Sequence, residues 1–97
     1  MKKIPPYIAS CLWSYDISKL DLQKDKKMII AQVLNYGDFK SIKWLYNIYP
    51  EKTIKEVIKN PKRGFWFEKV LNFWLTLFNI HLSNRKTGEA ILSIEPG

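Results

Sequence analysis

Residues 29–38 have the sequence IIAQVLNYGD, which predicts a helix that ends in a tight corner. Their apolar side chains recur at the i, i+1, i+4, i+5 spacing of a buried helical face: Ile29, Ile30, Val33 and Leu34. Gly37 is expected in the left-handed conformation that commonly follows a helix end. Asp38 is expected to cap the next helix. We therefore predict one helix over about residues 23–36 and a second over about residues 39–48, with Phe39 joining its apolar face at the start.

Two further helices are predicted over about residues 51–60 and 65–80, and the core positions of the first are Ile54, Val57 and Ile58. Pro50 ends the second helix and suits the first turn of the third, while Asn60-Pro61 stops the third. The fourth is unusual, since its polar side chains all fall within a stripe of about 100°. Such a helix either packs on two sides or leaves one side for a partner.

The predicted fold is all-α, a compact bundle of about four helices with an irregular N-terminal segment. Residues 1–82 would form a single helical domain, and residues 83–97 a flexible or extended, loose C-terminal tail.

Composition argues against the commonest kinds of enzyme. The chain has 97 residues, of which 46% are apolar and 14% aromatic, so it is long enough and apolar enough to fold as one domain. Its one cysteine, Cys11, excludes an intramolecular disulfide and a Cys-rich zinc site, and its one histidine, His81, removes most metal and triad arrangements. Phosphate-binding, dinucleotide-binding and zinc-protease motifs are absent from the sequence. We expect no catalytic residue, no metal and no cofactor.

The remaining catalytic candidates have simpler explanations. Four aspartates fall near predicted helix starts, where capping accounts for them: Asp16, Asp21, Asp25 and Asp38. A Cys11–His81 nucleophile pair is conceivable in principle, but a buried cysteine is more often a packing residue. Residues 65–80 are too short and too polar to span a bilayer, and Pro5-Pro6 interrupts any signal-peptide core. A cytoplasmic protein without a membrane segment is therefore expected.

The net positive charge is confined to the first two thirds of the chain. The net charge of +7 lies within residues 1–63, and residues 64–97 are neutral. Within the third predicted helix and the turn after it, basic residues recur on one side: Lys52, Lys55, Lys59, Lys62 and Arg63. Such a stripe is commonly a solvated face, but it could also follow the phosphates of a nucleic acid. A DNA-binding transcriptional regulator is the alternative function that this stripe predicts.

Aromatic residues are more numerous than a small helical core requires. The chain has four Trp, five Tyr and five Phe, and each buried aromatic ring removes roughly 150–250 Å² from water. Trp and Tyr dominate the energetics of many protein interfaces. The surplus therefore favours binding of a partner protein or self-association as a homodimer. The predicted contact residues are Trp13, Trp44, Trp66, Phe73 and Leu77.

Several motifs between residues 10 and 80 resemble a family of small, uncharacterised, mostly bacterial helical domains. The similar residues form four groups: Leu12-Trp13-Ser14-Tyr15-Asp16 with Lys19-Leu20-Asp21; Ile29-Ile30, Val33-Leu34, Gly37-Asp38, Ile42, Trp44-Leu45 and Tyr49; Ile54-Lys55-Glu56-Val57-Ile58; and Asn72-Phe73-Trp74. Domains of this kind are often encoded beside nucleotidyltransferase toxins of the abortive-infection class. The resemblance implies an antitoxin-like role, in which the chain binds a toxin-like nucleotidyltransferase, represses its operon, or does both.

The chain departs from the family pattern just before Asn72-Phe73-Trp74. The family tends to have a helix start that bears Ser or Thr and an Arg-rich turn, whereas this chain has Trp66-Phe67-Glu68-Lys69-Val70. A role that depends on those hydroxyl groups is not expected here. The replacement also makes this part of the surface more apolar, which agrees with a protein partner.

Overall fold

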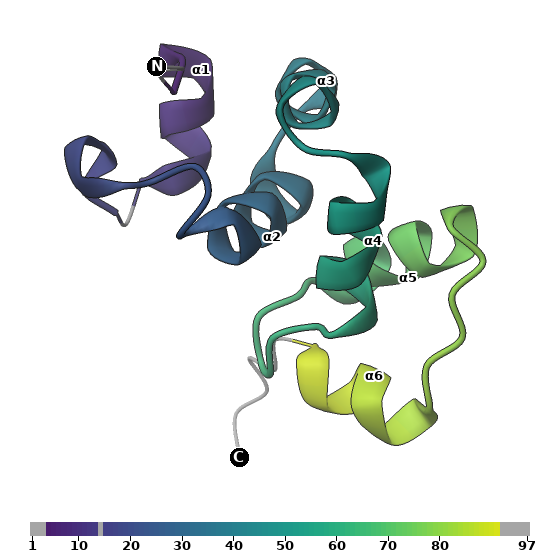
Figure 1. Cartoon of the computed structure of the whole chain (residues 1–97). Helices are drawn as coiled ribbons and strands as arrows, with labels where there is room; N and C mark the ends of the chain where they lie inside the picture. Colours follow the sequence, from purple (N-terminus) through teal and green to yellow (C-terminus); the bar gives the residue numbers. More distant parts are fainter. Residues whose placement is uncertain (1–3, 14, 92–97) are drawn as a thin grey trace. The chain divides into compact units, whose positions relative to one another are not determined.

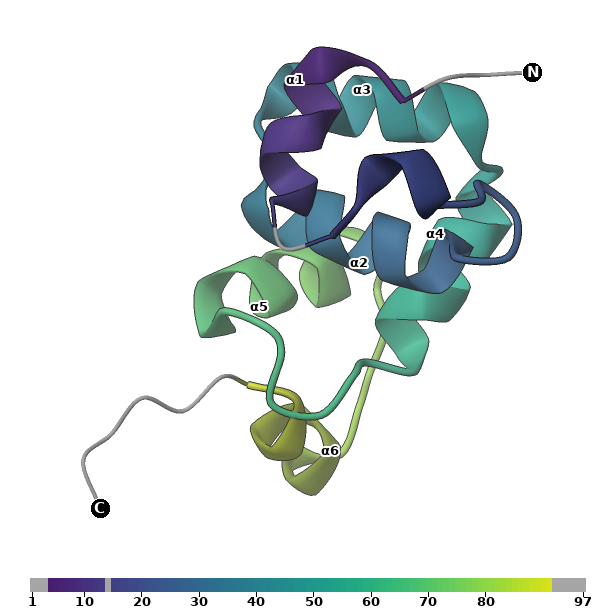
Figure 2. The same cartoon turned by 90° about the vertical axis from the view of Figure 1, so that its left-hand side faces the viewer.

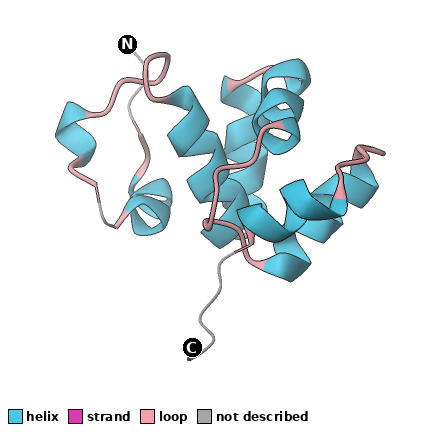
Figure 3. Cartoon of the chain, turned by 90° about the horizontal axis from the view of Figure 1, so that it is seen from below, coloured by secondary structure: helices cyan, strands magenta, loops and turns pink. Residues whose placement is uncertain are grey.

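The computed structural model describes residues 4–13 and 15–91, which are mostly helical (Figures 1 and 3). The α-helices are α1 (Pro6–Ala9), α2 (Lys26–Tyr36), α3 (Phe39–Ile48), α4 (Glu51–Lys59), α5 (Glu68–Leu77) and α6 (Asn84–Ala90). Two short 3-10 turns span Ser10–Leu12 and Ile17–Lys19. No β-strand occurs in the described residues. The all-α class is confirmed, but residues 4–13 and 15–91 form six α-helices instead of the predicted bundle of about four.

The chain divides into two units, Met1–Glu51 and Lys52–Gly97. We call them the N-terminal unit and the C-terminal unit, and each is described by itself. The limit between them falls at the first residue of α4. The assignment of residues 1–82 to one domain stays a prediction.

Helix α2 supplies most of the core of the N-terminal unit. Residues 29–35 are all buried, including the polar Gln32 and Asn35, so more than one face of the helix is covered. Ile8 from α1, Leu12 from the following 3-10 turn and Leu45 from α3 are fully buried as well. In Figure 2, α1 and α3 are drawn above α2. The stripe that predicted this helix is thus confirmed, although burial extends beyond it.

An aspartate turn delays the start of α2, which begins at Lys26 rather than near residue 23. The Asp21 carboxylate accepts hydrogen bonds from the backbone N–H groups of Gln23 and Lys24, each at 2.8 Å. These bonds hold residues 21–24 in a local turn that competes with the helix. The backbone bond from Lys24, followed by that from Gln23, lowers the pKa of Asp21 below its ordinary 3.8.

The corner between α2 and α3 forms where predicted, but for a different reason. Gly37 has φ −81° and ψ 160°, an extended conformation, so the left-handed prediction is wrong. The glycine is required by close packing instead, because a Cβ there would lie 2.5 Å from the Val33 carbonyl oxygen and 2.9 Å from Ser41 Cβ. Asp38 caps α3 as predicted, since its carboxylate accepts from the Ser41 N–H and hydroxyl at 2.9 Å each. The backbone bond from Ser41 is the main cause that lowers the pKa of Asp38.

The C-terminal unit starts with α4, whose buried face consists of Ile54, Val57 and Ile58, as predicted. Helix α5 is shorter than predicted and begins at Glu68. The residues before it form a turn and a bridge outside the helix, where the N–H groups of Phe65 and Trp66 both donate to the Ala90 carbonyl, at 3.0 and 2.8 Å. Trp66 also pairs with Ile91 in an isolated parallel bridge. Figure 2 shows this α4–α5 connection passing the end of α6.

Asn79 ends α5 earlier than the apolar pattern indicates. Its φ of 55° is left-handed, a conformation that asparagine tolerates better than most residues. The Ile80 N–H then donates to the Leu75 carbonyl at 2.8 Å, which closes the helix in the manner of a Schellman motif. Residues 78–80 therefore lie outside the helix, although Phe78 and Ile80 continue its apolar pattern.

The predicted loose tail from residue 83 is wrong for residues 84–90, which form α6. The Ser83 hydroxyl caps this helix by accepting from the Lys86 N–H at 3.1 Å. Arg85 and Glu89 form an i, i+4 ion pair at 3.4 Å on its surface. Ala90 is buried, and its carbonyl is the acceptor that fixes Phe65 and Trp66. The part of the predicted tail at residues 92–97 lies outside the described residues.

Candidate interaction surfaces

Helix α5 exposes two large apolar side chains one turn apart. Phe73 and Leu77 are 58% and 57% exposed, and their i, i+4 spacing places them on one face of the helix. We call this pair the α5 stripe. On the other side of α5, Leu71, Trp74 and Leu75 are buried. Phe73 contacts Trp74 edge to face, with ring centroids 5.0 Å apart, so its ring is anchored while one side stays open to solvent.

Two of the predicted contact residues belong to the core instead. Trp66 is fully buried, and Trp44 is only 9% exposed. Trp66 lies outside α5, where its backbone pairs with Ala90 and Ile91 at the end of α6, a contact that local periodicity does not report. Trp44 is buried because the covered face of α3 contains Ser41, Trp44 and Leu45. The prediction that these two tryptophans form an accessible surface is therefore wrong.

The buried Trp66 carries an unusual polar atom. Its indole N–H has no hydrogen-bond partner among the described residues. Leaving a buried donor unsatisfied costs roughly 1–3 kcal/mol. The large apolar area of the ring offsets this cost, which indicates that packing rather than a hydrogen bond of the indole holds the Trp66 side chain in place.

A second surface lies in the N-terminal unit, at the start of α3 and beside α1. Phe39 is 77% exposed and Trp13 is 68% exposed. The Lys40 ammonium lies 4.3 Å from the ring centroid of Tyr7, and the Lys43 ammonium lies 6.0 Å from that of Phe39. Trp13 packs edge-on against Tyr36, with ring centroids 6.3 Å apart. We call the six residues the aromatic–lysine surface: Tyr7, Trp13, Tyr36, Phe39, Lys40 and Lys43.

Sequence reasoning missed most of this surface. It placed Phe39 with the apolar face of α3, but Phe39 lies about opposite the buried residues Ser41, Trp44 and Leu45 at 100° per residue. The buried serine hides the true face from an apolar pattern, because its hydroxyl is satisfied by Asp38. Lys40 and Lys43 could have indicated that this face of α3 is exposed, since lysine rarely occurs on a buried face.

The predicted basic stripe is only partly open. Lys52, Lys59, Lys62 and Arg63 are exposed. The Lys55 ammonium lies 5.4 Å from the ring centroid of Phe78, and that of Lys62 lies 5.9 Å from the ring of Phe65. Arg63 pairs with Glu89 at 3.6 Å. The basic residues thus share the surface with aromatic rings and a carboxylate rather than forming an uninterrupted positive strip.

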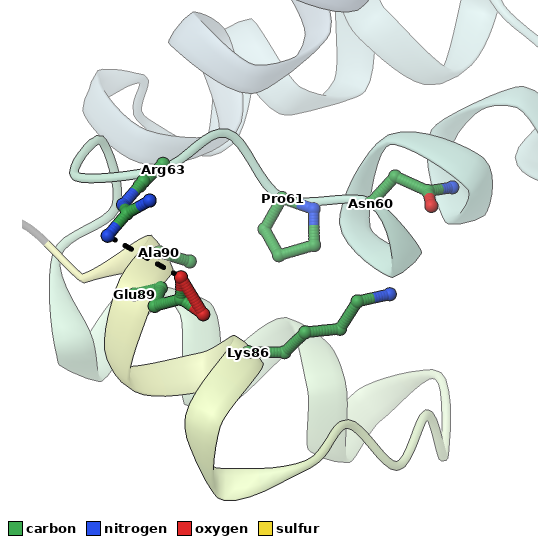
Figure 4. A pocket seen from close by; sticks show the side chains of 6 residues that line it. All are labelled: Asn60, Pro61, Arg63, Lys86, Glu89 and Ala90. Atoms are coloured by element: carbon green, nitrogen blue, oxygen red, sulfur yellow. Dashed lines mark ion pairs between the residues drawn. The ribbon is translucent and has the colours of Figure 1, made fainter.

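An open pocket of about 310 Å³ lies between the turn after α4 and the face of α6 (Figure 4). Its lining residues are Asn60, Pro61, Arg63, Lys86, Glu89 and Ala90. The Glu89 carboxylate forms ion pairs with both Arg63 and Arg85. It therefore offsets part of the positive charge beside the pocket. The sequence analysis missed Lys86 and Glu89 because it treated residues 83–97 as a tail.

The chain matches the sequence profile of a protein family of unknown function, DUF6922, over residues 8–58. This match covers slightly more than half of the chain. The chain belongs to the DUF6922 family. Comparison with the curated proteins and with the solved structures found no match.

The DUF6922 match separates the two exposed surfaces. It includes α2, α3 and nearly all of α4, and with them every member of the aromatic–lysine surface except Tyr7. The α5 stripe and the Trp66–Ala90 contact lie beyond it.

No three His, Cys, Asp or Glu side chains among residues 4–13 and 15–91 lie close enough together to hold a metal ion. Cys11 is buried, with its sulfur 3.9 Å from the Ser41 hydroxyl, as expected for a packing residue. His81 is exposed. No described helix is long and apolar enough to cross a membrane.

Proposed function

We propose that this chain is a non-catalytic protein-interaction module, antitoxin-like, which binds and neutralises a partner protein through the α5 stripe. The observation that carries the proposal is the exposure of Phe73 and Leu77 on a helix whose other side supplies the core of the C-terminal unit. Aromatic side chains are enriched among the residues that contribute most to binding energy at interfaces. Trp13, the third predicted contact residue that is exposed, lies in the N-terminal unit.

The α5 stripe has the construction of an anchor. Phe73 is fixed on one side by its edge contact with Trp74, so binding would immobilise few new rotamers and lose little side-chain entropy. Polar side chains flank the stripe on the same helix, with Asn72 and Thr76 both exposed. An apolar centre with a polar border is typical of a protein interface.

The class of partner is supported by the family resemblance of the sequence. Similar domains are often encoded beside nucleotidyltransferase toxins, so we propose a toxin-like nucleotidyltransferase in the cytoplasm as the partner. Neutralisation would follow from the chain occupying a surface that the toxin needs for its activity. No residue of this chain is assigned a chemical step in that scheme.

Co-expression with the product of the neighbouring gene tests this proposal. The chain should relieve growth arrest caused by that protein and co-purify with it. Phe73→Asp and Leu77→Asp should abolish both effects, because a carboxylate in a desolvated apolar interface is costly. Asn72→Asp and Thr76→Asp add the same charge to exposed polar positions of α5 and should leave both effects intact. Equal activity of all four variants would refute the role of the α5 stripe.

A homodimer is the competing use of the same stripe. Sedimentation equilibrium of the purified chain separates the two possibilities. A partner-binding module should sediment as a monomer, and Phe73→Asp should not change its mass. A dimer that Phe73→Asp converts to a monomer would assign the stripe to self-association.

The second candidate function is a DNA-binding transcriptional regulator. It is favoured by the exposure of Lys52, Lys59, Lys62 and Arg63. Binding to duplex DNA from upstream of its own gene should weaken steeply with salt and be lost when these four residues become alanine. Lys27→Ala, at an exposed lysine of the N-terminal unit, is the matched control. Absence of binding at low salt would eliminate this function.

A further inference from the structure

The aromatic–lysine surface is a poor candidate for a purely structural role. Phe39 and Trp13 are the two most exposed of the large apolar side chains described. Phe39 lies beside the Lys43 ammonium, and Trp13 packs edge-on against Tyr36. Exposing two such rings gains nothing for folding, because their area stays in water.

The positive charges on this surface are fixed near the rings. The Lys40 ammonium lies 4.3 Å from the Tyr7 ring centroid, which ties the first turn of α3 to α1. Lys43 follows one turn later along α3 and lies near the Phe39 ring. Asp38 is the nearest acidic residue in sequence, and its carboxylate is engaged by Ser41. Lys40 is thus shared between the Tyr7 ring and the charge of Asp38, whereas Lys43 lies beside the exposed Phe39 ring.

We propose that the aromatic–lysine surface binds single-stranded nucleic acid. Flat bases stack on exposed aromatic rings whatever their identity, while the phosphates between them are attracted to lysine. Phe39 and Trp13 would each take a base, and Lys40 and Lys43 would contact the phosphates. Phe39 has no hydrogen-bonding group, so it can recognise a ring face but not a base edge. The surface is accordingly suited to unpaired strands without sequence preference rather than to a duplex, whose bases are already stacked.

Fluorescence anisotropy with a labelled 20-nucleotide oligo(dT) or oligo(U) tests this proposal on the whole chain. We expect binding at low salt and markedly weaker binding to a duplex of the same length. Phe39→Ala and Trp13→Ala should each weaken binding about 10-fold, the effect of losing one base–aromatic stack. Both side chains are mostly exposed, so neither change should unfold the protein. Intrinsic fluorescence gives a second readout, because the other three tryptophans are at most 9% exposed and quenching should come from Trp13.

The salt dependence of oligonucleotide binding distinguishes the contribution of the lysine charges from that of the aromatic rings. Replacing Lys40 or Lys43 with alanine should reduce the slope of log K against log salt by about 0.7 for each lost phosphate contact. Phe39→Ala should lower affinity and leave that slope nearly unchanged. Phe73→Ala in the C-terminal unit, at a comparably exposed phenylalanine, is the control and should bind the oligonucleotide normally.

Three results would overturn the proposal. The first is absence of single-strand binding at low salt. The second is binding that survives Phe39→Ala and Trp13→Ala but is lost with Lys52→Ala and Lys59→Ala, which would assign the nucleic acid to α4. The third is tight binding of polyglutamate, abolished by the same aromatic variants and with no response to oligonucleotide, which would identify an acidic protein as the ligand. None of these outcomes depends on whether the α5 stripe binds a toxin.

Discussion

The two units are stabilised in different ways. In the N-terminal unit, burial is spread along residues 29–35 of α2, and the corner that follows is fixed by neighbours in sequence, Gly37 and Asp38. In the C-terminal unit, the segment before α5 depends on a contact with the far end of the chain, where Phe65 and Trp66 donate to Ala90. The α2–α3 corner is thus fixed by neighbours in sequence, whereas the segment before α5 requires the last helix to be in place.

Trp66→Ala should have the largest effect on stability. Removing this fully buried ring is expected to cost about 3–5 kcal/mol. Trp13→Ala is the control and should change stability by less than about 0.5 kcal/mol, since Trp13 is 68% exposed. Urea unfolding followed by circular dichroism measures both. Similar costs for the two variants would show that the C-terminal unit does not depend on Trp66.

Gly37→Ala tests the close-packed corner of the N-terminal unit. A Cβ at 2.5 Å from the Val33 carbonyl forces the backbone apart, so we expect a loss of about 1–3 kcal/mol. Gly88→Ala is the matched change in the C-terminal unit. Nothing lies within 4 Å of a Cβ at Gly88, which is inside α6, so alanine should stabilise by up to about 1 kcal/mol. Thermal unfolding should give opposite signs, and destabilisation by both would refute the comparison.

Tyr49→Phe should cost about 1 kcal/mol, the usual net value of one hydrogen bond. The Tyr49 hydroxyl donates to the Leu22 carbonyl at 2.6 Å and ties the end of α3 to the turn before α2. Urea unfolding at neutral pH measures the loss. An unchanged midpoint would mean that this bond contributes nothing to the N-terminal unit.

Tyr49 also makes the stability of the folded protein depend on pH. Burial, followed by the charges of Asp21 and Asp25, raises the pKa of Tyr49 from 10.0 to about 12. A raised folded pKa favours the neutral phenol, so its contribution is complete below pH 10 and is lost as the pH rises from 10 to about 12. The difference in stability between wild type and Tyr49→Phe should therefore shrink over that range. A difference that grows with pH would contradict the assignment.

Arg63→Ala should have the smallest effect, within about 0.5 kcal/mol. Arg63 pairs with Glu89 at 3.6 Å on an exposed surface, where ion pairs contribute little. Denaturation at low and at high salt measures the change, which should vanish at high salt. A loss that persists at high salt would indicate that Arg63 packs against the pocket rather than acting through its charge.

Sequence reasoning was most reliable where local chemistry decides the structure. The Asp38 cap, the stop at Pro50 and the buried face of α4 are confirmed. It failed at residues 65–67, since their helix-like apolar pattern gives way to hydrogen bonds with Ala90. It also failed at Phe39, because a buried serine disguised the covered face of α3. Of the candidate contact residues, exposed Phe73 and Leu77 could be predicted from periodicity, whereas the burial of Trp44 and Trp66 depends on tertiary packing.

Each unit is proposed to have its own binding surface, and two matched variants measured against both ligands distinguish these surfaces. Phe73→Asp and Phe39→Asp place the same charge at exposed phenylalanines of different units. Calorimetric titration with the neighbouring gene product and with oligo(dT) measures both functions in each variant. Phe73→Asp should abolish binding of the neighbouring gene product and leave binding of oligo(dT) unchanged. Phe39→Asp should abolish binding of oligo(dT) and leave binding of the gene product unchanged. Loss of both ligands in one variant, with the other variant unaffected, would contradict this assignment of the two surfaces.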